Sequence, residues 1–284
     1  GNWEPKELDV VGDYLIHKYT ASTGNDAYSI SKVQQAPNGE IYAKHYNNRN
    51  NMRLQGEWAT VKPRNAEQAC LIDILNDESK KVVVATGSYG TGKSYLTMNY
   101  LLNAIDFSGR FTSKVPGVDI PQIVVIPNNS IVSDSREVGI LPGDLIDKEL
   151  PYLGSFVDLL GEEYIAELVD QGIIKVVPLA HLRGRNFDNT LIYVQEAQNL
   201  TRSHVQLIVG RVGYNSRVLF DGDIKQADKN IFKRDNGLIL LNALRAESRD
   251  RGLIGTVRLQ TIERSPVAQL AADLEDFEEE LSRK

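Results

Sequence analysis

The chain is poor in cysteine, methionine and tryptophan, and it has no long hydrophobic run. Its 284 residues include one cysteine, Cys70, so no disulfide can form within the chain. A chain without disulfides is typical of a reducing compartment, and we expect a cytoplasmic protein. No hydrophobic run approaches the ~20 residues that span a bilayer, and no signal peptide is visible, so we expect no membrane association.

An excess of basic residues is also missing. The net charge is −6, with 38 acidic against 32 basic residues. This balance excludes a globally basic nucleic-acid binder but leaves room for a locally basic path. Hydrophobic residues make up 42% and charged residues 25%, which are ordinary globular values and exclude wholesale disorder.

The first 60 residues predict a small module of antiparallel strands. Aromatic and β-branched residues alternate with polar ones over residues 14–19, 28–33 and 41–46. The pair Asn38-Gly39 lies between the last two runs and is a typical hairpin turn. We therefore predict a β-rich module over residues 1–60 and a second domain over residues 61–284.

From residue 61 on, helical patterns alternate with short apolar runs. Helices are predicted over residues 66–75, 93–104 and 159–168. Buried strands are predicted over residues 81–86, 122–126, 174–179, 191–194, 218–220 and 257–259. This alternation predicts an α/β fold with a mainly parallel sheet covered on both faces. The acidic run over residues 273–280 predicts a solvated helix end.

One segment carries a phosphate-binding motif. Residues 87–94 match G-x-x-x-x-G-K-[ST], between a predicted strand and a predicted helix. Backbone N–H groups of such a loop face phosphates, the lysine reaches the β- and γ-phosphates, and the serine hydroxyl ligates Mg²⁺. We therefore predict ATP and Mg²⁺ as cofactors, bound by Gly87, Ser88, Tyr89, Gly90, Thr91, Gly92, Lys93 and Ser94.

The strand predicted over residues 191–194 ends in polar groups that suit catalysis. Glu196 follows this strand, and we predict that it polarises the attacking water. The metal-side position before it is Gln195, whose neutral amide lacks the charge of a carboxylate. If Gln195 does not contact the metal, Asp221 and Asp223 are the next candidates for the acidic group that holds it.

The strand predicted over residues 218–220 ends in a similar way. Asp223 and Gln226 follow it, and they are placed where a group that senses the γ-phosphate is expected. We therefore predict a catalytic role for both side chains.

Together these segments resemble the PhoH family of P-loop ATPases. The resemblance covers about residues 62–274, and the matching segments occur in the family's order. They are residues 63–68, 87–94, 141–145, 183–185, 196–200, 211–213, 222–226 and 263–265. The resemblance implies a RecA-like P-loop NTPase core, ATP hydrolysis, kinship to superfamily-one helicases, a hexameric ring and a role linked to RNA or single-stranded nucleic acid.

The resemblance also implies roles for single residues. Gln68 is similar to the adenine-reading glutamine of helicases. Arg183 and Arg185 are candidate nucleic-acid contacts, and Arg211 or Arg264 could act as an arginine finger in a neighbouring subunit. Residues 1–60 resemble the β-rich segment that joins a PIN nuclease to the ATPase in some members, and no nuclease activity is assigned to them.

This chain departs from the family pattern at two places. The family has an aspartate where Gln195 stands, and it usually has an arginine after the strand over residues 122–126, where this chain has Pro127-Asn128-Asn129. We expect an ATPase that couples hydrolysis to RNA binding or remodelling. Two alternatives stay open: a nucleotide-gated binding module that hydrolyses little, and a small-molecule kinase.

Overall fold

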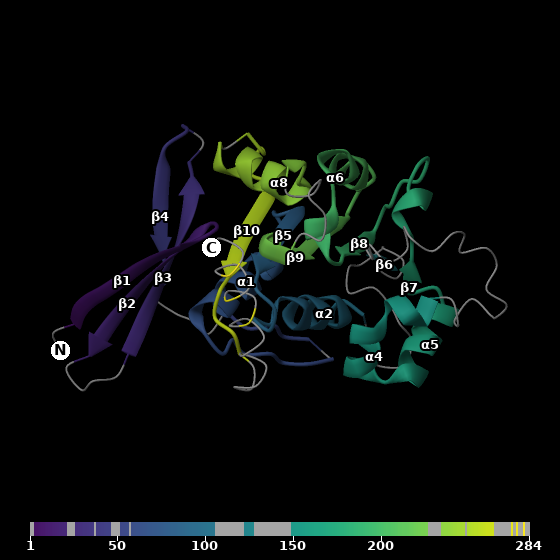
Figure 1. Ribbon diagram of the computed structural model, residues 1–284, viewed down its shortest axis with the longest axis horizontal. Coiled ribbons are helices and arrows are strands. Elements are labelled where there is room, and N and C mark those ends of the chain that lie inside the picture. Colours follow the sequence, from purple (N-terminus) through teal and green to yellow (C-terminus); the bar gives the residue numbers. More distant parts are fainter. Residues whose placement is uncertain are drawn as a thin grey trace.

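The computed structural model describes most of the chain and contains two sheets. The described residues are 3–21, 26–36, 38–46, 52–56, 58–105, 122–127, 149–226, 234–247 and 249–263, with Leu274, Phe277 and Leu281. Figure 1 shows the antiparallel sheet at the left and the larger, helix-covered sheet beside it. Arg264, the segment 141–145 and most of the acidic run 273–280 lie outside the described residues.

The antiparallel sheet confirms the predicted β module. Its strands follow one another in space as in sequence: β1 (Trp3–Val11), β2 (Tyr14–Ala21), β3 (Asp26–Gln35) and β4 (Ile41–His45). β1 was not predicted, because Pro5 and charged residues interrupt its sequence pattern. The register of β1 on β2 shifts between Pro5 and Glu7, as expected where a proline enters an edge strand. The boundary at residue 60 stays a prediction.

The second sheet has six strands, and every neighbouring pair is parallel. The strands are β5 (Val82–Gly87), β6 (Gln122–Ile126), β7 (Ile174–Val176), β8 (Thr190–Val194), β9 (Arg217–Gly222) and β10 (Ile254–Leu259). Their order is β10-β5-β9-β8-β6-β7. The predicted parallel core is confirmed, and β9 rather than β8 lies next to β5.

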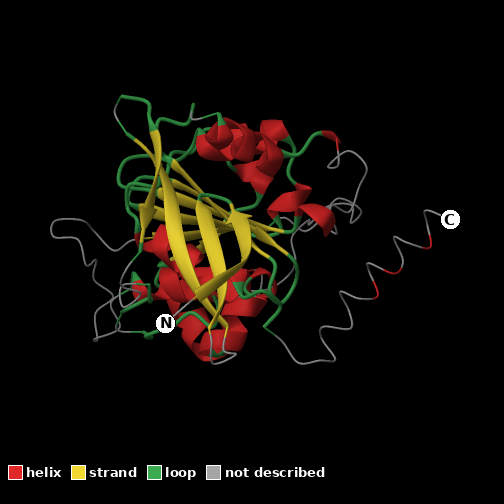
Figure 2. Cartoon of the chain, turned by 90° about the vertical axis from the view of Figure 1, so that its left-hand side faces the viewer, coloured by secondary structure: helices red, strands yellow, loops and turns green. Residues whose placement is uncertain are grey.

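Helices cover both faces of this sheet. They are α1 (Ala66–Asn76), α2 (Lys93–Asn103), α4 (Gly154–Leu160), α5 (Glu162–Asp170), α6 (Arg202–Val209) and α8 (Gly237–Ala246). Short 3₁₀ helices are η3 (Leu150–Tyr152), η4 (Leu179–His181), η5 (Ala197–Asn199) and η6 (Ile224–Gln226). In Figure 1, α6 and α8 lie above the sheet and the other α-helices below it, and Figure 2 shows the strands between these two groups.

Alternate residues of the strands belong to two separate clusters of the core. On β5, Val83 and Ala85 pack in the cluster that contains the buried side of α1 and α2. Val82 and Val84 pack in the other cluster, together with Val205 of α6 and Leu238 of α8. Because successive side chains of a strand point to opposite faces, a strand buried on both faces is apolar throughout. This is why β5 appears in the sequence as a continuous apolar run.

The structure corrects the prediction of one helix over residues 159–168. The chain forms two helices there, α4 and α5, which are separated at Gly161. Gly161 has a φ of +89°, a value that glycine adopts easily and that interrupts a right-handed helix. The strand predicted over residues 174–179 is also shorter, since β7 ends at Val176.

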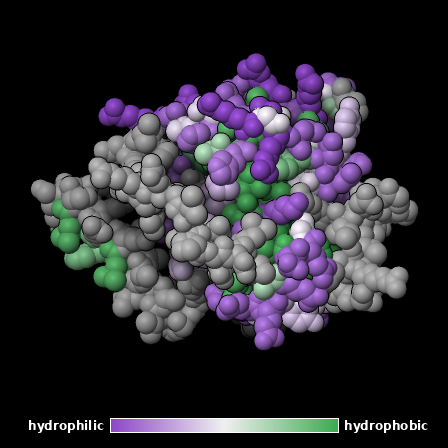
Figure 3. All heavy atoms as spheres, turned by 90° about the vertical axis from the view of Figure 1, so that its right-hand side faces the viewer, coloured by the Kyte–Doolittle hydropathy of each residue, from purple (hydrophilic) through white to green (hydrophobic). Residues whose placement is uncertain are grey.

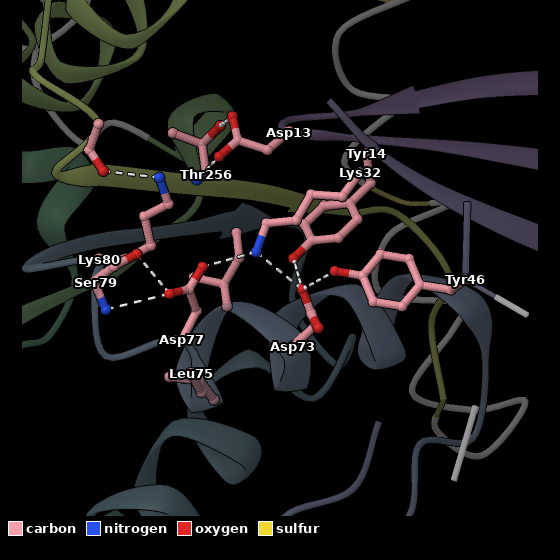
Figure 4. A network of polar contacts seen from close by, with 12 residues as sticks. Asp13, Tyr14, Lys32, Tyr46, Asp73, Leu75, Asp77, Ser79, Lys80 and Thr256 are labelled. Atoms are coloured by element: carbon pink, nitrogen blue, oxygen red, sulfur yellow. Dashed lines mark hydrogen bonds and ion pairs between the residues drawn. The ribbon is translucent and has the colours of Figure 1, made fainter. Parts of the chain in front are cut away.

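A network of polar contacts joins the antiparallel sheet to α1 (Figure 4). Lys32 of β3 places its Nζ 3.1 Å from Asp73 Oδ2 and 2.9 Å from Asp77 Oδ2. The hydroxyls of Tyr14 and Tyr46 donate to the same oxygen of Asp73, at 2.5 and 2.9 Å. The Asp73 carboxylate is therefore held by three side chains of the module, from β2, from β3 and from the residue that follows β4.

A second contact joins the module to β10. The backbone N–H of Asp13 donates to the carbonyl of Thr256 at 2.9 Å, and the Asp13 carboxylate forms an ion pair of 3.0 Å with Arg245. A Cβ on Gly12 would lie 2.2 Å from the Thr256 carbonyl oxygen. Only glycine permits this close approach of the two backbones.

On the right-hand face of Figure 1, hydrophilic residues cover most of the described surface, and hydrophobic ones gather near its centre (Figure 3). No helix in the described ranges is long and apolar enough to cross a membrane.

Candidate functional site

The predicted phosphate-binding loop connects β5 to α2, as the motif requires. β5 ends at Gly87, and α2 begins at Lys93. Gly87 has a φ of +149°, and a Cβ there would lie 2.0 Å from the carbonyl oxygen of Leu259. Gly90 and Gly92 also have positive φ values, 80° and 90°. The loop therefore depends on glycine both for its turns and for its contact with β10.

The start of α2 provides an anion-binding position. Gly92 is its N-cap, and a glycine offers no side chain to accept from the N–H groups of the first turn. Those donors, together with the positive end of the helix dipole, are suited to phosphate oxygens.

Gln68 of α1 is hydrogen-bonded to the phosphate-binding loop. Its Nε2 donates to the Thr91 carbonyl at 3.0 Å, and its Oε1 accepts from the Arg64 backbone N–H at 3.0 Å. Gln68 is only 5% exposed. Both ends of the amide are thus engaged by backbone groups, and the role of Gln68 in reading adenine stays a prediction.

Glu263 also contacts the phosphate-binding loop. Its backbone N–H donates to the Gly90 carbonyl at 3.0 Å. Its carboxylate accepts from Asn65 Nδ2 at 2.7 Å, and Asn65 caps α1. The segment 63–68 and Glu263 therefore lie together beside the phosphate-binding loop.

The ammonium group of Lys93 lies on the loop itself. It is buried, and its Nζ donates to the Ser88 carbonyl at 3.0 Å. A lysine in this position carries a positive charge at the edge of the cavity and can turn toward an anion by side-chain rotation alone.

Ser94, the next residue of α2, is hydrogen-bonded to a carboxylate. Its Oγ donates to Asp221 Oδ2 at 2.5 Å, and Tyr193 OH donates to the same oxygen at 2.8 Å. Burial, and then the negative charge of Asp221, raise the pKa of Tyr193 well above its ordinary value. Tyr193 therefore stays protonated and remains a donor to Asp221 at neutral pH.

Gln195 and Glu196 follow β8, but their backbone conformations and contacts differ. The backbone N–H of Gln195 donates to the Ile126 carbonyl at 3.2 Å, which continues the sheet. Glu196 is exposed and adopts a left-handed φ of 50°. Its Oε2 accepts from Gln198 Nε2 at 2.6 Å.

Gln198 also connects Glu196 to the end of β9. Its Oε1 accepts from the backbone N–H of Asp223 at 3.0 Å. Asp223 Oδ1 in turn accepts from the Lys225 N–H at 3.1 Å, and the Gln226 N–H donates to the Asp223 carbonyl at 2.9 Å. Because one buried amide holds both segments, Glu196 and Asp223 are positioned relative to each other.

These groups surround a cavity of about 530 Å³. That volume lies in the range of small-molecule sites. Of the predicted site residues, the cavity is lined by Gln68, Tyr89, Gly90, Gly92, Lys93, Ser94, Glu196, Asp223 and Gln226. Asp221 lines it as well, together with the segment 59–62. Gln195, Arg183, Arg185 and Arg211 are not among its lining residues.

Two of the predicted arginines, Arg185 and Arg211, are in contact with each other outside this cavity. Arg211 follows α6, and its Nη1 donates to the Arg185 carbonyl at 3.4 Å. The Arg211 carbonyl accepts from the Phe187 N–H at 2.9 Å, so the two arginine segments run side by side. Arg183 and Arg185 are exposed. The structure thus brings Arg185 and Arg211 together, but not with the phosphate-binding loop of the same chain.

Tyr193 and Gln198 have no predicted role, and Asp221 was predicted to serve the metal only if Gln195 does not. Gln198 and Tyr193 lie in or just after a predicted strand, where a core position is the ordinary interpretation. Asp221 directly follows the apolar run 218–220, which was a usable signal. Its contact with Ser94 depends on β9 lying beside β5, and strand order cannot be read from one sequence.

Comparison with known proteins shows the family of the chain. The sequence profile of the family described as PhoH-like protein matches residues 60–275. Protein PhoH2 of Mycolicibacterium smegmatis is 31% identical over 272 residues, which cover 94% of this chain and 57% of that protein. Protein PhoH2 of Thermobispora bispora is 33% identical over 218 residues, which cover 75% of this chain and 47% of that protein. The chain thus spans about half the length of these curated relatives.

A solved structure, the helicase nonstructural protein 10 of an arterivirus, is also similar, with 12% identity and a TM-score of 0.28. The alignment covers 92% of this chain and 52% of the helicase chain. With so low a TM-score, no functional conclusion is taken from this structure. Two findings decide the family. The family profile matches most of the chain, and residues 82–103 have the strand–loop–helix geometry of a phosphate-binding loop. The chain belongs to the PhoH family and is a P-loop NTPase of the PhoH type.

Proposed function

We propose that the chain binds ATP with Mg²⁺ in this cavity, hydrolyses it, and couples hydrolysis to the binding or remodelling of RNA. One observation carries the proposal. The phosphate-binding loop and the side chains of Glu196, Asp223 and Gln226 line the same cavity, although they come from three distant parts of the sequence.

Each group in the cavity has a separate role in hydrolysis. N–H groups of the loop and of the first turn of α2 bind phosphate oxygens, and Lys93 exchanges the Ser88 carbonyl for the β- and γ-phosphates. Glu196 accepts a hydrogen bond from the attacking water and orients it. Asp223 and Gln226 contact the γ-phosphate side of the site, where a change from ATP to ADP alters their hydrogen bonds.

The residues beside α2 also fit Mg²⁺. The Ser94 hydroxyl and the Asp221 carboxylate are hard oxygen donors, the type that this ion prefers. Among the described residues no cluster of three or more His, Cys, Asp or Glu forms a metal site by itself. This agrees with an ion that is bound mainly through phosphates and water. When bound, Mg²⁺ neutralises part of the negative charge of the triphosphate.

We assign Arg183, Arg185 and Arg211 to contacts beyond this chain's own nucleotide. Arg183 and Arg185 would bind phosphates of RNA, since guanidinium groups donate to two phosphate oxygens at once. Arg211 would reach the nucleotide of a neighbouring copy in a ring. Because the net charge is −6, RNA binding must depend on such local groups, and its affinity must fall as salt rises.

A nucleotide-gated binding module is the second candidate. It is favoured by Gln195, a neutral amide at the end of β8. Such a module would bind ATP and a partner but would hydrolyse little.

A turnover assay with and without RNA distinguishes these functions. We expect ATP hydrolysis that RNA stimulates. Lys93→Ala should abolish it and weaken ATP binding at least about tenfold, because charge-assisted contacts contribute about 1.5–3 kcal/mol each. Lys175→Ala, an exposed lysine on the far edge strand β7, is the matched control and should change neither property.

Other results would contradict the proposal in different ways. Tight ATP binding without turnover would establish the module. Turnover that requires a small acceptor would establish a kinase. Equal ATP affinity for Lys93→Ala and the unsubstituted chain would remove the phosphate-loop assignment itself.

A further inference from the structure

The carboxylate that the end of β8 lacks has a counterpart on the neighbouring strand. Gln195 follows β8, which is separated from β5 by β9. Asp221 lies in β9 and pairs with Ala85 of β5, two residues before the phosphate-binding loop. Because β9 is a direct neighbour of β5 and β8 is not, the carboxyl end of β9 lies closer to this loop than that of β8.

Alternation along β9 points the Asp221 side chain toward α2. Leu219 packs in the same core cluster as Ala85 and Leu101 of α2, and Asp221 lies two residues after Leu219. Because side chains at positions i and i+2 share a face, Asp221 points to the side of the sheet that α2 covers. The 2.5 Å hydrogen bond from Ser94 is the direct result.

We propose that Asp221 supplies the acidic group of the magnesium site, in place of the residue at position 195. The inference rests on the proposed binding of ATP and Mg²⁺. Asp221 is 6% exposed, lines the cavity, and receives the hydroxyl of Ser94, the residue that the loop motif assigns to the metal.

The carboxylate is also oriented for this role. Ser94 and Tyr193 both donate to Oδ2. The other oxygen, Oδ1, accepts no hydrogen bond from the described part of the chain, so it can accept from a water on the metal. Tyr193 comes from β8, which means that this strand orients the carboxylate through Tyr193 instead of providing one.

Charge decides between the two positions. A carboxylate beside Mg²⁺ adds an attraction that the amide of Gln195 cannot provide, whatever its geometry. Removing a group that orients a metal ligand typically lowers metal affinity about 10- to 100-fold. Neutralising Asp221 and truncating Gln195 in separate variants therefore shows which of the two residues serves the metal.

The experiment measures metal-dependent binding without turnover. The β,γ-imido analogue of ATP is titrated into the full chain by calorimetry, in Mg²⁺ and in EDTA, and the ratio of the two affinities is the readout. Electron paramagnetic resonance of Mn²⁺ with the same analogue counts bound metal directly. The variants are Asp221→Asn, Gln195→Ala and, as the matched control, Asp235→Asn at an exposed site.

We expect Asp221→Asn to lose about 10-fold or more of the Mg²⁺ enhancement, while its affinity in EDTA is kept. Gln195→Ala and Asp235→Asn should keep the full enhancement. Full enhancement in Asp221→Asn, or its loss in Gln195→Ala, would overturn the inference but leave nucleotide binding intact. If Asp221→Asn does not fold, Gln195→Ala still decides, because loss of the enhancement there assigns the metal to position 195. Absence of any binding by the unsubstituted chain would overturn the proposed function as well.

Discussion

Gln68 and Thr91 are joined by a hydrogen bond that ties the phosphate-binding loop to the first turn of α1. Gln68 Nε2 donates to the Thr91 carbonyl at 3.0 Å, and a Cβ at Gly92 would lie 2.7 Å from the same nitrogen. The glycine at position 92 thus leaves room for the Gln68 amide beside the loop.

This relationship predicts the effect of Gln68→Ala on nucleotide binding. The variant leaves the Thr91 carbonyl and the Arg64 N–H without their partner, which costs about 1–3 kcal/mol where such groups are buried. Because the amide is engaged with the backbone and not with open space, we expect ATP and GTP affinity to fall by the same factor. Calorimetric titration with both nucleotides measures this. A loss restricted to ATP would instead establish that Gln68 reads adenine.

Gly87→Ala should destabilise the whole P-loop core. The added Cβ would meet the Leu259 carbonyl oxygen at 2.0 Å, at a φ of +149°. We expect the free energy of unfolding in urea to fall by about 2–4 kcal/mol. Gly154→Ala is the matched control, since nothing lies within 4 Å of its added Cβ and it begins α4. An unchanged unfolding midpoint in Gly87→Ala would contradict the close contact between β5 and β10.

Lys32→Met should weaken the junction between the β module and α1. Burial raises the pKa of Asp77, but hydrogen bonds from Ser79 and Lys32 outweigh it and lower the pKa from 3.8 to about 2. The folded form therefore gains stability above pH 4, and this gain is lost as the pH falls from about 4 to 2. In Lys32→Met we expect lower stability at pH 7, by about 1–3 kcal/mol, and a smaller further loss between pH 4 and 2.

Urea unfolding at a series of pH values checks both parts of this prediction. Arg202→Met is the control, because the Arg202–Asp235 pair is exposed and such pairs contribute about 1 kcal/mol or less. An acid dependence identical to that of the unsubstituted chain would show that Lys32 does not set the pKa of Asp77.

Arg211→Ala tests whether copies of the chain share a site. If Arg211 acts on a neighbour's nucleotide, subunits with Arg211→Ala mixed with Glu196→Gln subunits should recover part of the lost turnover. Where a Glu196→Gln subunit presents its intact Arg211 to an Arg211→Ala subunit, the shared site again has both groups. Light scattering gives the mass of the assembly in the same samples. No recovery at any ratio, or a monomeric mass, would exclude a shared site formed by Arg211.

The local features of the sequence predicted most of the core. The six apolar runs were recognisable because parallel strands are buried on both faces, and the loop motif fixed the start of α2 at Lys93. The failures were also local. Pro5 and charged neighbours concealed β1, and the helical pattern over residues 159–168 continued across Gly161, where the backbone turns away.

The sequence alone determined the chemistry of the loop, because glycine spacing, Lys93 and Ser94 are properties of consecutive residues. Only the tertiary structure decided which carboxylate meets Ser94. Asp221 and Gln195 each directly follow an apolar run of the sequence, so the pattern does not distinguish their positions, but β9 pairs with β5 and β8 does not. Strand order depends on how the connecting helices pack over the whole sheet, so the contact between residues 127 positions apart exists only in the folded chain.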